Sequence, residues 1–247
     1  MYLCTMSLSA QIRNIIKQLP NGKTFGYDDL CIPKESYTSA AKALERLQKE
    51  DLIKKVSKGV FYKPEKTVFG ALEPDYNELL RPYLFENGKR IAYETGTALY
   101  NRLGLTTQMA FRTKIASRSK RISIDRKSLK ADAVKSYAEV NDSNYAILGI
   151  LDAFKDIKRI PDSSVDQTIG RLSMILKELN PKQIESLVKY APVYPPRVRA
   201  LVGAVLQNNG YQEKGLERLK YSLNPLTIIQ LGLDDSELPT KNNWYIE

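Results

Sequence analysis

Apolar residues in the first 50 positions recur with the period of a helix. They line one side of the chain over 12–19 and again over 40–47, which predicts two amphipathic helices. Ser36 is placed to cap the second helix, which we expect to run to about Lys49. A short helix over 27–31 is expected between the two, because Ile32-Pro33 follows it and would stop it.

The hydrophobic period then changes to two over residues 53–62. Ser57-Lys58-Gly59 interrupts that alternation, which predicts a β-hairpin with Gly59 in its turn. Helix, short helix, helix and hairpin is the element order of a winged helix-turn-helix, a fold that binds DNA through its third element. We therefore predict such a domain over residues 1–70.

The polar residues of the second long helix gather on the side opposite its apolar stripe. In the DNA-binding hypothesis this side faces a groove or the phosphates. The candidate residues are Thr38, Ser39, Lys42, Arg46 and Lys49. The hairpin would add cations that hold the DNA backbone, namely Lys54, Lys55, Lys58 and Lys63. The alternative is that these side chains form only the solvated face of a helix and a hairpin.

Residues 71–137 predict a mixture of short elements. A helix is expected over Asp75–Glu86 despite Pro82, and a shorter one over Gly96–Gly104. Residues 109–137 alternate in hydrophobicity, which predicts small antiparallel strands with an exposed basic face. That face is a candidate partner or nucleic-acid surface made of Arg112, Lys114, Arg118, Lys120 and Arg121.

Helical stripes continue from Asn144 to the C-terminus, so residues 138–247 are expected to be mainly helical. Pro195-Pro196 is typical of a helix start. Arg197 and Arg199 follow it and are candidates for a partner surface, or for internal salt bridges to carboxylates. The whole chain is thus predicted to be α+β, with the winged helix-turn-helix followed by a second domain over 71–247.

Charge is distributed unevenly along the chain. The net charge is +10, with +5 in residues 1–70, +6 in residues 71–137 and −1 in residues 138–247. A basic half joined to a neutral half favours a polyanionic partner for the first, above all double-stranded DNA. An acidic protein partner remains a second interpretation, and a solvated lysine-rich surface a third.

The composition excludes several kinds of site. The chain has no histidine, which rules out Ser-His-Asp and Cys-His nucleophile pairs and every histidine-containing metal site. Two cysteines do not make a disulfide framework. An enzyme that uses carboxylates or the Thr95-Gly96-Thr97 turn remains an alternative. Because no constellation of residues supports it, we expect a protein that is not an enzyme and that needs no metal or cofactor. The absence of a long apolar run or signal-peptide pattern predicts a cytoplasmic protein without a membrane partner.

Several strings of the sequence together resemble the AbiEi-like proteins of bacteria, in a branch long labelled a domain of unknown function. They are the hairpin string 52–64, the strings 95–99 and 104–108, and the strings 152–162 and 194–204. The resemblance implies a winged-helix N-terminal domain and a C-terminal domain with antitoxin activity. It further implies repression of the protein's own operon through inverted repeats, and antagonism of a nucleotidyltransferase-fold toxin encoded nearby. It carries no catalytic motif.

Overall fold

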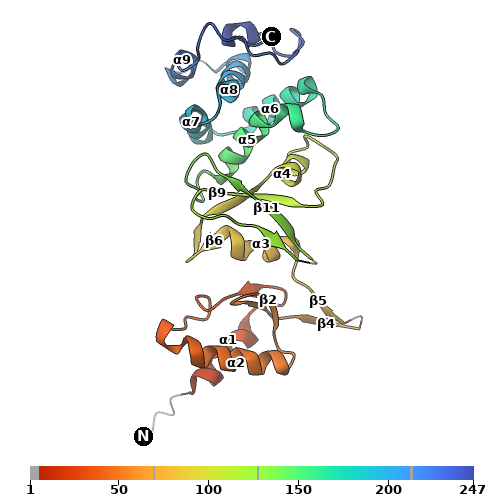
Figure 1. The fold of residues 1–247 in the computed structure, drawn as a ribbon, viewed down its shortest axis with the longest axis vertical. Helices are drawn as coiled ribbons and strands as arrows, with labels where there is room; N and C mark the ends of the chain where they lie inside the picture. Colours follow the sequence, from red (N-terminus) through yellow and green to blue (C-terminus); the bar gives the residue numbers. More distant parts are fainter. Residues whose placement is uncertain (1–5, 69, 127, 212–213) are drawn as a thin grey trace. The chain divides into compact units, whose positions relative to one another are not determined.

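A computed structural model of the chain describes residues 6–68, 70–126, 128–211 and 214–247. The fold is mixed α and β, as predicted (Figure 1). The chain divides into two compact units, Met1–Gly88 and Lys89–Glu247. The elements of the first unit are α1 (Leu8–Gln18), β1 (Thr24–Phe25), a 3-10 turn (Lys34–Ser36), α2 (Tyr37–Lys49), β2 (Lys54–Ser57), β3 (Val60–Tyr62), β4 (Glu65–Thr67), β5 (Gly70–Leu72), α3 (Tyr76–Leu84) and β6 (Phe85–Glu86).

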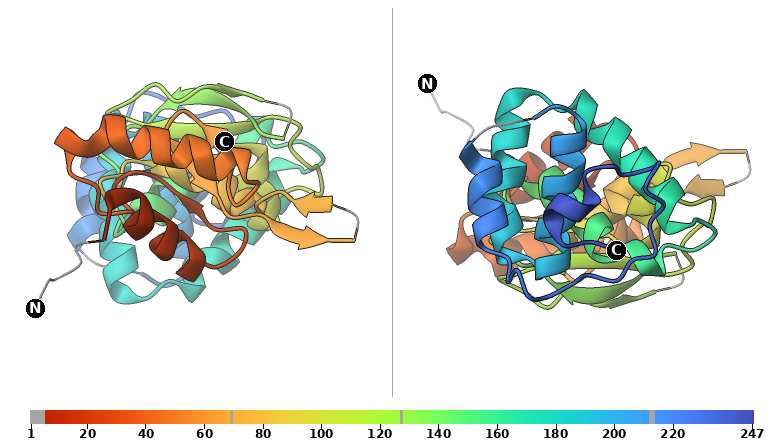
Figure 2. Two further views of the ribbon diagram at one scale, coloured as in Figure 1. Left: turned by 90° about the horizontal axis from the view of Figure 1, so that it is seen from below. Right: turned by 90° about the horizontal axis from the view of Figure 1, so that it is seen from above.

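Helices α1 and α2 form where the apolar stripes predicted them, and they lie side by side (Figures 1 and 2). Their apolar faces share one core, in which Ile12, Ile16 and Leu44 are buried. Ser36 holds the N-cap position of α2, although its side chain makes no capping bond.

The prediction of a short helix over 27–31 is wrong, because this segment forms turns. Leu30 N donates to Tyr27 O and Cys31 N to Asp28 O, and Cys31 then adopts a positive φ of 53°. A left-handed residue ends a helix at that point, and Ile32-Pro33 cannot continue it. Between the two helices stand turns and the 3-10 turn that leads into α2.

The predicted hairpin is confirmed. Strands β2 and β3 pair antiparallel, and Gly59 has a φ of 75° in the turn between them. Glycine suits this position because a side chain would strain the left-handed backbone. Strand β1 pairs with the other edge of β3, so the sheet has the order β1-β3-β2. Phe25 and Phe61 bring this sheet onto the core of α1 and α2.

Helix α3 belongs with the first unit, whereas the sequence placed the domain boundary at residue 70. The Glu78 carboxylate accepts hydrogen bonds from Thr24 N and Thr24 Oγ1, both at 2.8 Å. Arg81 also donates to the carbonyl oxygen of Thr24. These bonds tie α3 to β1, a contact between residues too far apart in the chain for a local pattern to reveal.

The second unit opens with a four-stranded sheet and continues with helices. Its elements are β7 (Lys89–Arg90), β8 (Ala92–Thr95), α4 (Thr97–Arg102), β9 (Thr113–Ser117), β10 (Ile124–Asp125), β11 (Lys130–Lys135), α5 (Tyr145–Lys155), a 3-10 turn (Ile157–Arg159), α6 (Val165–Glu178), α7 (Pro181–Tyr190), a 3-10 turn (Ala191–Val193), α8 (Pro196–Asn208), α9 (Lys214–Tyr221) and a 3-10 turn (Lys241–Trp244).

The sheet has the order β10-β11-β9-β8 and departs from the antiparallel arrangement expected. The outer pairs, β8 with β9 and β10 with β11, are antiparallel, but β9 and β11 run parallel. Parallel neighbours need a crossover of about a dozen residues or more. The segment between Ser117 and Lys130 provides it and carries β10.

Helices α7 and α8 pack against α5, which is buried over most of its length. The predicted stripes are confirmed, and the C-terminal tail packs back onto the unit, running over α8 (Figure 2). Trp244 lies so close to Gly203 of α8 that an added Cβ would stand 2.2 Å from its ring. The indole Nε1 donates to Gln207 at 2.7 Å.

Candidate functional site

The polar face of α2 is exposed as predicted. Thr38, Ser39, Lys42, Arg46 and Lys49 are all open to solvent, while Ala40, Ala43, Leu44 and Leu47 are buried. Because α1 packs against the buried face of α2, the exposed face points away from α1. An accessible helix face of this kind can lie along a DNA groove.

The hairpin lysines differ from one another. Lys54, Lys55 and Lys58 are exposed on β2 and the turn. Lys63 is half-buried, and its ammonium donates to the carbonyl oxygens of Lys17 at 2.9 Å and Leu19 at 3.0 Å. Those carbonyls lie at the C-terminal end of α1, where a cation satisfies free acceptors. Lys63 therefore stabilises the fold, and it is the weakest candidate of the predicted DNA-binding set.

Few carboxylates neutralise the face of α2. The side chains of Lys42 and Arg46 have no ion pair or hydrogen bond to any residue within the described chain. Lys49 pairs with Glu45 one turn away at 3.1 Å, with both side chains largely exposed. Exposed pairs of this kind contribute only about 0.2–1 kcal/mol, so the pair can exchange for a phosphate at little cost.

The basic face predicted for the second unit is partly neutralised by ion pairs within that unit. Arg112, directly before β9, contacts Asp132 of β11 at 2.9 Å and Asp125 of β10 at 3.7 Å. Its hydrogen bond holds the pKa of the Asp132 carboxyl below its usual range. Lys120 and Arg121 are exposed beyond the end of β9.

Arg197 and Arg199 pair with main-chain carbonyls. Arg197 donates to the carbonyl oxygen of Lys155, and Arg199 to that of Ser222 at 2.9 Å. No salt bridge from either to a carboxylate occurs among the described residues, so the internal ion pairs considered from the sequence are not found. Both arginines join the start of α8 to the ends of other helices.

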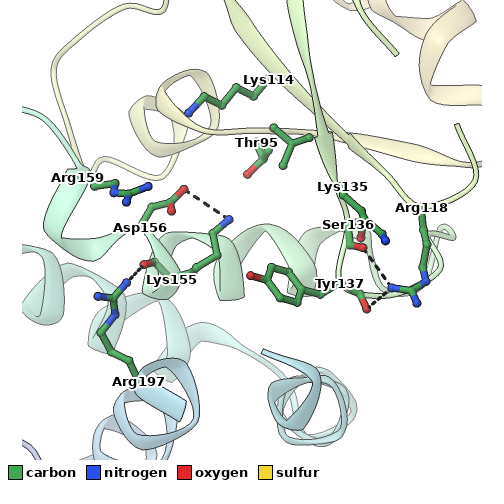
Figure 3. A pocket seen from close by; sticks show the side chains of 11 residues that line it. Thr95, Lys114, Arg118, Lys135, Ser136, Tyr137, Lys155, Asp156, Arg159 and Arg197 are labelled. Carbon is green, nitrogen blue, oxygen red and sulfur yellow. Dashed lines mark hydrogen bonds and ion pairs between the residues drawn. The ribbon is translucent and has the colours of Figure 1, made fainter. Parts of the chain in front are cut away.

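A basic pocket of about 750 Å³ opens between the sheet and the helices of the second unit (Figure 3). Thr95, Ser136 and Tyr137 contribute to its wall, and Asp156 is the acidic residue that lines it. Six cationic side chains line it as well: Lys114, Arg118, Lys135, Lys155, Arg159 and Arg197. They come from β9 and the residue after it, from β11, from the C-terminal end of α5 and the 3-10 turn that follows it, and from the start of α8. The pocket is therefore assembled from distant parts of the sequence.

A buried hydrogen-bond network lies beside this pocket and is centred on Asp152. Its carboxylate accepts from Tyr93 at 2.9 Å, from Thr95 at 2.8 Å and from Tyr194 at 3.4 Å. The ammonium of Lys155 donates to the same carboxylate at 3.1 Å and lies 3.6 Å from Asp156. The network therefore fixes the position of the Lys155 ammonium at the pocket wall.

The electrostatics of this pair follow from its burial. Burial raises the pKa of the Asp152 carboxyl, against the opposing effect of Lys155 and the hydroxyl donors. Burial acts to lower the pKa of Lys155, but the carboxylates of Asp152 and Asp156 outweigh it and raise that pKa. Lys155 thus stays a cation at neutral pH.

The sequence prediction named three of the six basic pocket residues, with Lys114 and Arg118 on one basic face and Arg197 on another surface. It missed Lys135, Lys155 and Arg159. One signal was available, because Asp152 interrupts the otherwise apolar face of α5 with a carboxylate that is 2% exposed. A charged residue on a buried stripe requires a partner, and Lys155 lies one helical turn away.

Two kinds of feature are absent from the described residues. No helix in that part of the chain is long and apolar enough to cross a membrane. No cluster of three or more histidine, cysteine, aspartate and glutamate side chains able to hold a metal ion was found there.

Comparisons with known proteins give a family and a fold. Residues 11–184 match a family described as "Family of unknown function (DUF6088)". Among solved structures, the chain is similar to the Rv2827c protein of Mycobacterium tuberculosis, with a TM-score of 0.50 and 11% identity, over 89% of this chain and 83% of that chain. A comparison with curated proteins gave no match.

Proposed function

Because the chain belongs to DUF6088, a family of unknown function, we propose a function from its own residues: it is a DNA-binding regulator that contacts duplex DNA through α2 and the β2–β3 hairpin. The observation that carries this proposal is the exposed face of α2, where Lys42 and Arg46 stand without partners among the described residues. The exposed hairpin lysines Lys54, Lys55 and Lys58 belong to the same unit and supply further positive charge.

The arrangement of the first unit suits this task in three respects. The order α1, β1, turn, α2, β2, β3 matches that of a winged helix-turn-helix, with turns in place of its second helix. The opposite face of α2 is anchored in a core of its own, which holds the exposed face rigid. Residues 1–70 carry a net charge of +5, which favours association with phosphates at low salt.

The test is DNA binding by the full-length protein and two charge-matched double variants. Lys42→Glu with Lys58→Glu reverses charge on the helix face and the hairpin turn. Lys17→Glu with Lys182→Glu makes the same change in net charge at exposed positions on α1 and α7. The proposal requires that only the first variant loses binding to duplex DNA. Equal losses in both would mean that net charge alone attracts DNA.

We further propose that the second unit carries the antitoxin role implied by the resemblance to AbiEi-like proteins, antagonising a nucleotidyltransferase-fold toxin encoded nearby. Its support from the structure is that Lys89–Glu247 has a core separate from that of the first unit. An acidic protein that binds the basic residues of this unit is the competing interpretation.

Growth of cells that express such a neighbouring toxin separates the two roles. The Lys42→Glu, Lys58→Glu variant should still restore growth while failing to repress its operon, because its second unit is unchanged. If it fails to restore growth although it is folded and expressed, antagonism acts through DNA binding. If the wild type fails as well, the antitoxin role is wrong and an acidic partner becomes the interpretation to pursue.

A further inference from the structure

We propose that the basic pocket of the second unit is a binding site for a small molecule that carries a chain of two or more phosphates, such as a nucleoside triphosphate. This site is additional to the DNA-binding face, since every residue that lines it belongs to Lys89–Glu247. Figure 3 shows the side chains that form it.

Charge is the first argument. Six cationic side chains line the pocket against one carboxylate, Asp156. Asp152 and Glu139, outside the lining, pair with Lys155 at 3.1 Å and Arg118 at 3.7 Å, so the cations still outnumber the carboxylates. The Asp156 carboxylate is already engaged, because it accepts from the Tyr100 hydroxyl at 2.7 Å and lies near Lys155. The side chains of Lys135 and Arg159 have no ion pair or hydrogen bond within the described chain. The pocket thus holds an excess of positive charge that a multiply charged anion can neutralise.

The spread of the cations is the second argument. Lys114 stands on strand β9, while Lys155 and Arg159 stand on and just after helix α5, on the other side of the pocket (Figure 3). A single phosphate cannot contact groups that line a space of about 750 Å³, whereas a chain of phosphates can span it. Volumes of about 300–1,000 Å³ are typical of small-molecule sites. A concave site of this size fits a bounded ligand better than a continuous duplex.

Preorganisation is the third argument. The Lys155 ammonium is fixed by Asp152 and Asp156, and Asp152 is itself held by Tyr93 and Thr95. Arg197 is fixed by its bond to the carbonyl oxygen of Lys155. Cations held in place before binding lose little conformational freedom when the ligand arrives. Lys135 and Arg159 are the adjustable groups, and their removal should leave the fold intact because they make no such bonds.

The experiment is calorimetric titration of the full-length protein with tripolyphosphate and, separately, with ATP at low salt. The wild type should bind both. Lys135→Ala with Arg159→Ala should weaken binding at least about tenfold, since two charge-assisted contacts are lost. Lys177→Ala with Lys182→Ala removes two exposed cations from α6 and α7, outside the pocket, and should bind as the wild type does. Arg159→Lys keeps the positive charge, so it should retain most of the affinity that Arg159→Ala loses.

Four results decide the proposal. Failure of the wild type to bind either probe, or equal losses in the pocket and control variants, would overturn it. Tighter binding of ATP than of tripolyphosphate would support the site and show that the nucleoside also makes contacts. Duplex DNA provides the remaining arm, because the pocket variant should bind DNA as well as the wild type does. If the pocket variant instead loses DNA binding and the wild type binds neither phosphate compound, the pocket is part of a nucleic-acid surface and the proposal is wrong.

Discussion

The face of α2 and the pocket of the second unit are both basic, but they are built in opposite ways. The face is convex, and one helix with its neighbouring hairpin supplies it from residues 38–58. The pocket is concave, and its wall uses residues from Thr95 to Arg197. The cations of the face have few partners, whereas Lys155 and Arg197 of the pocket are fixed by a buried network. The first design suits an extended polyanion, and the second suits a small one.

The largest expected effect comes from destabilising the core of each unit separately. Leu44 and Leu201 are buried in the two different cores, and Leu→Ala at such positions costs about 2–5 kcal/mol. Leu44→Ala should lower the midpoint of the first unit's unfolding and abolish DNA binding, while tripolyphosphate binding remains. Leu201→Ala should lower the midpoint of the second unit's unfolding and abolish tripolyphosphate binding, while DNA binding remains. Thermal unfolding followed with each ligand measures both, and a single variant that abolishes both activities would contradict the separation of the sites.

A smaller effect is expected at Arg46. Arginine on a recognition helix can donate two bonds to guanine, which is worth about 1–3 kcal/mol of discrimination. Arg46→Ala should therefore reduce the preference for the operator over random duplex, as measured by competition binding. Lys58→Ala, on the hairpin turn, should weaken both DNAs alike. Equal losses on the two DNAs for Arg46→Ala would assign this side chain to a phosphate.

The smallest effect concerns alkaline pH. Burial, followed by the nearby carboxylates, raises the pKa of Tyr93, Tyr100 and Tyr194 far above the ordinary value. When folding raises the pKa of a tyrosine, its contribution to stability is fully present below the pKa that it has in the unfolded chain, about 10. That contribution is lost as the pH rises above this value. The second unit should thus lose stability above this pH. In an ultraviolet titration, these tyrosines should ionise only as the unit unfolds, and ionisation before unfolding would contradict the buried network.

The sequence reveals the face of α2 far better than the pocket. Every predicted residue of that face proved exposed, because one helical period sorts Lys42 from Leu44 within a single element. The hairpin was also predicted from a local pattern, because a period of two marks its strands and Gly59 marks its turn. Lys63 shows the limit, because its role depends on the end of α1, which the tertiary fold brings near.

The pocket could be predicted only with knowledge of how the strands pair. Lys114 and Lys135 line the same pocket from β9 and β11, which run parallel, whereas the alternation of residues 109–137 predicted antiparallel strands. Arg159 and Lys155 reach the same space because α5 ends beside that sheet. Local periodicity cannot report such contacts, and neither can it place a domain boundary that depends on the bonds between Thr24 and Glu78.

The central claim is that α2 and the hairpin contact DNA phosphates, and the salt dependence of binding tests it most directly. Log K for duplex DNA should fall linearly with log salt, with a slope of about 0.9 per neutralised phosphate. Lys42→Ala should reduce that slope by about one unit, since its ammonium has no other partner in the described chain. Lys17→Ala, on α1, should leave the slope unchanged. Absence of binding at low salt, or equal slopes for the wild type and Lys42→Ala, would contradict the account.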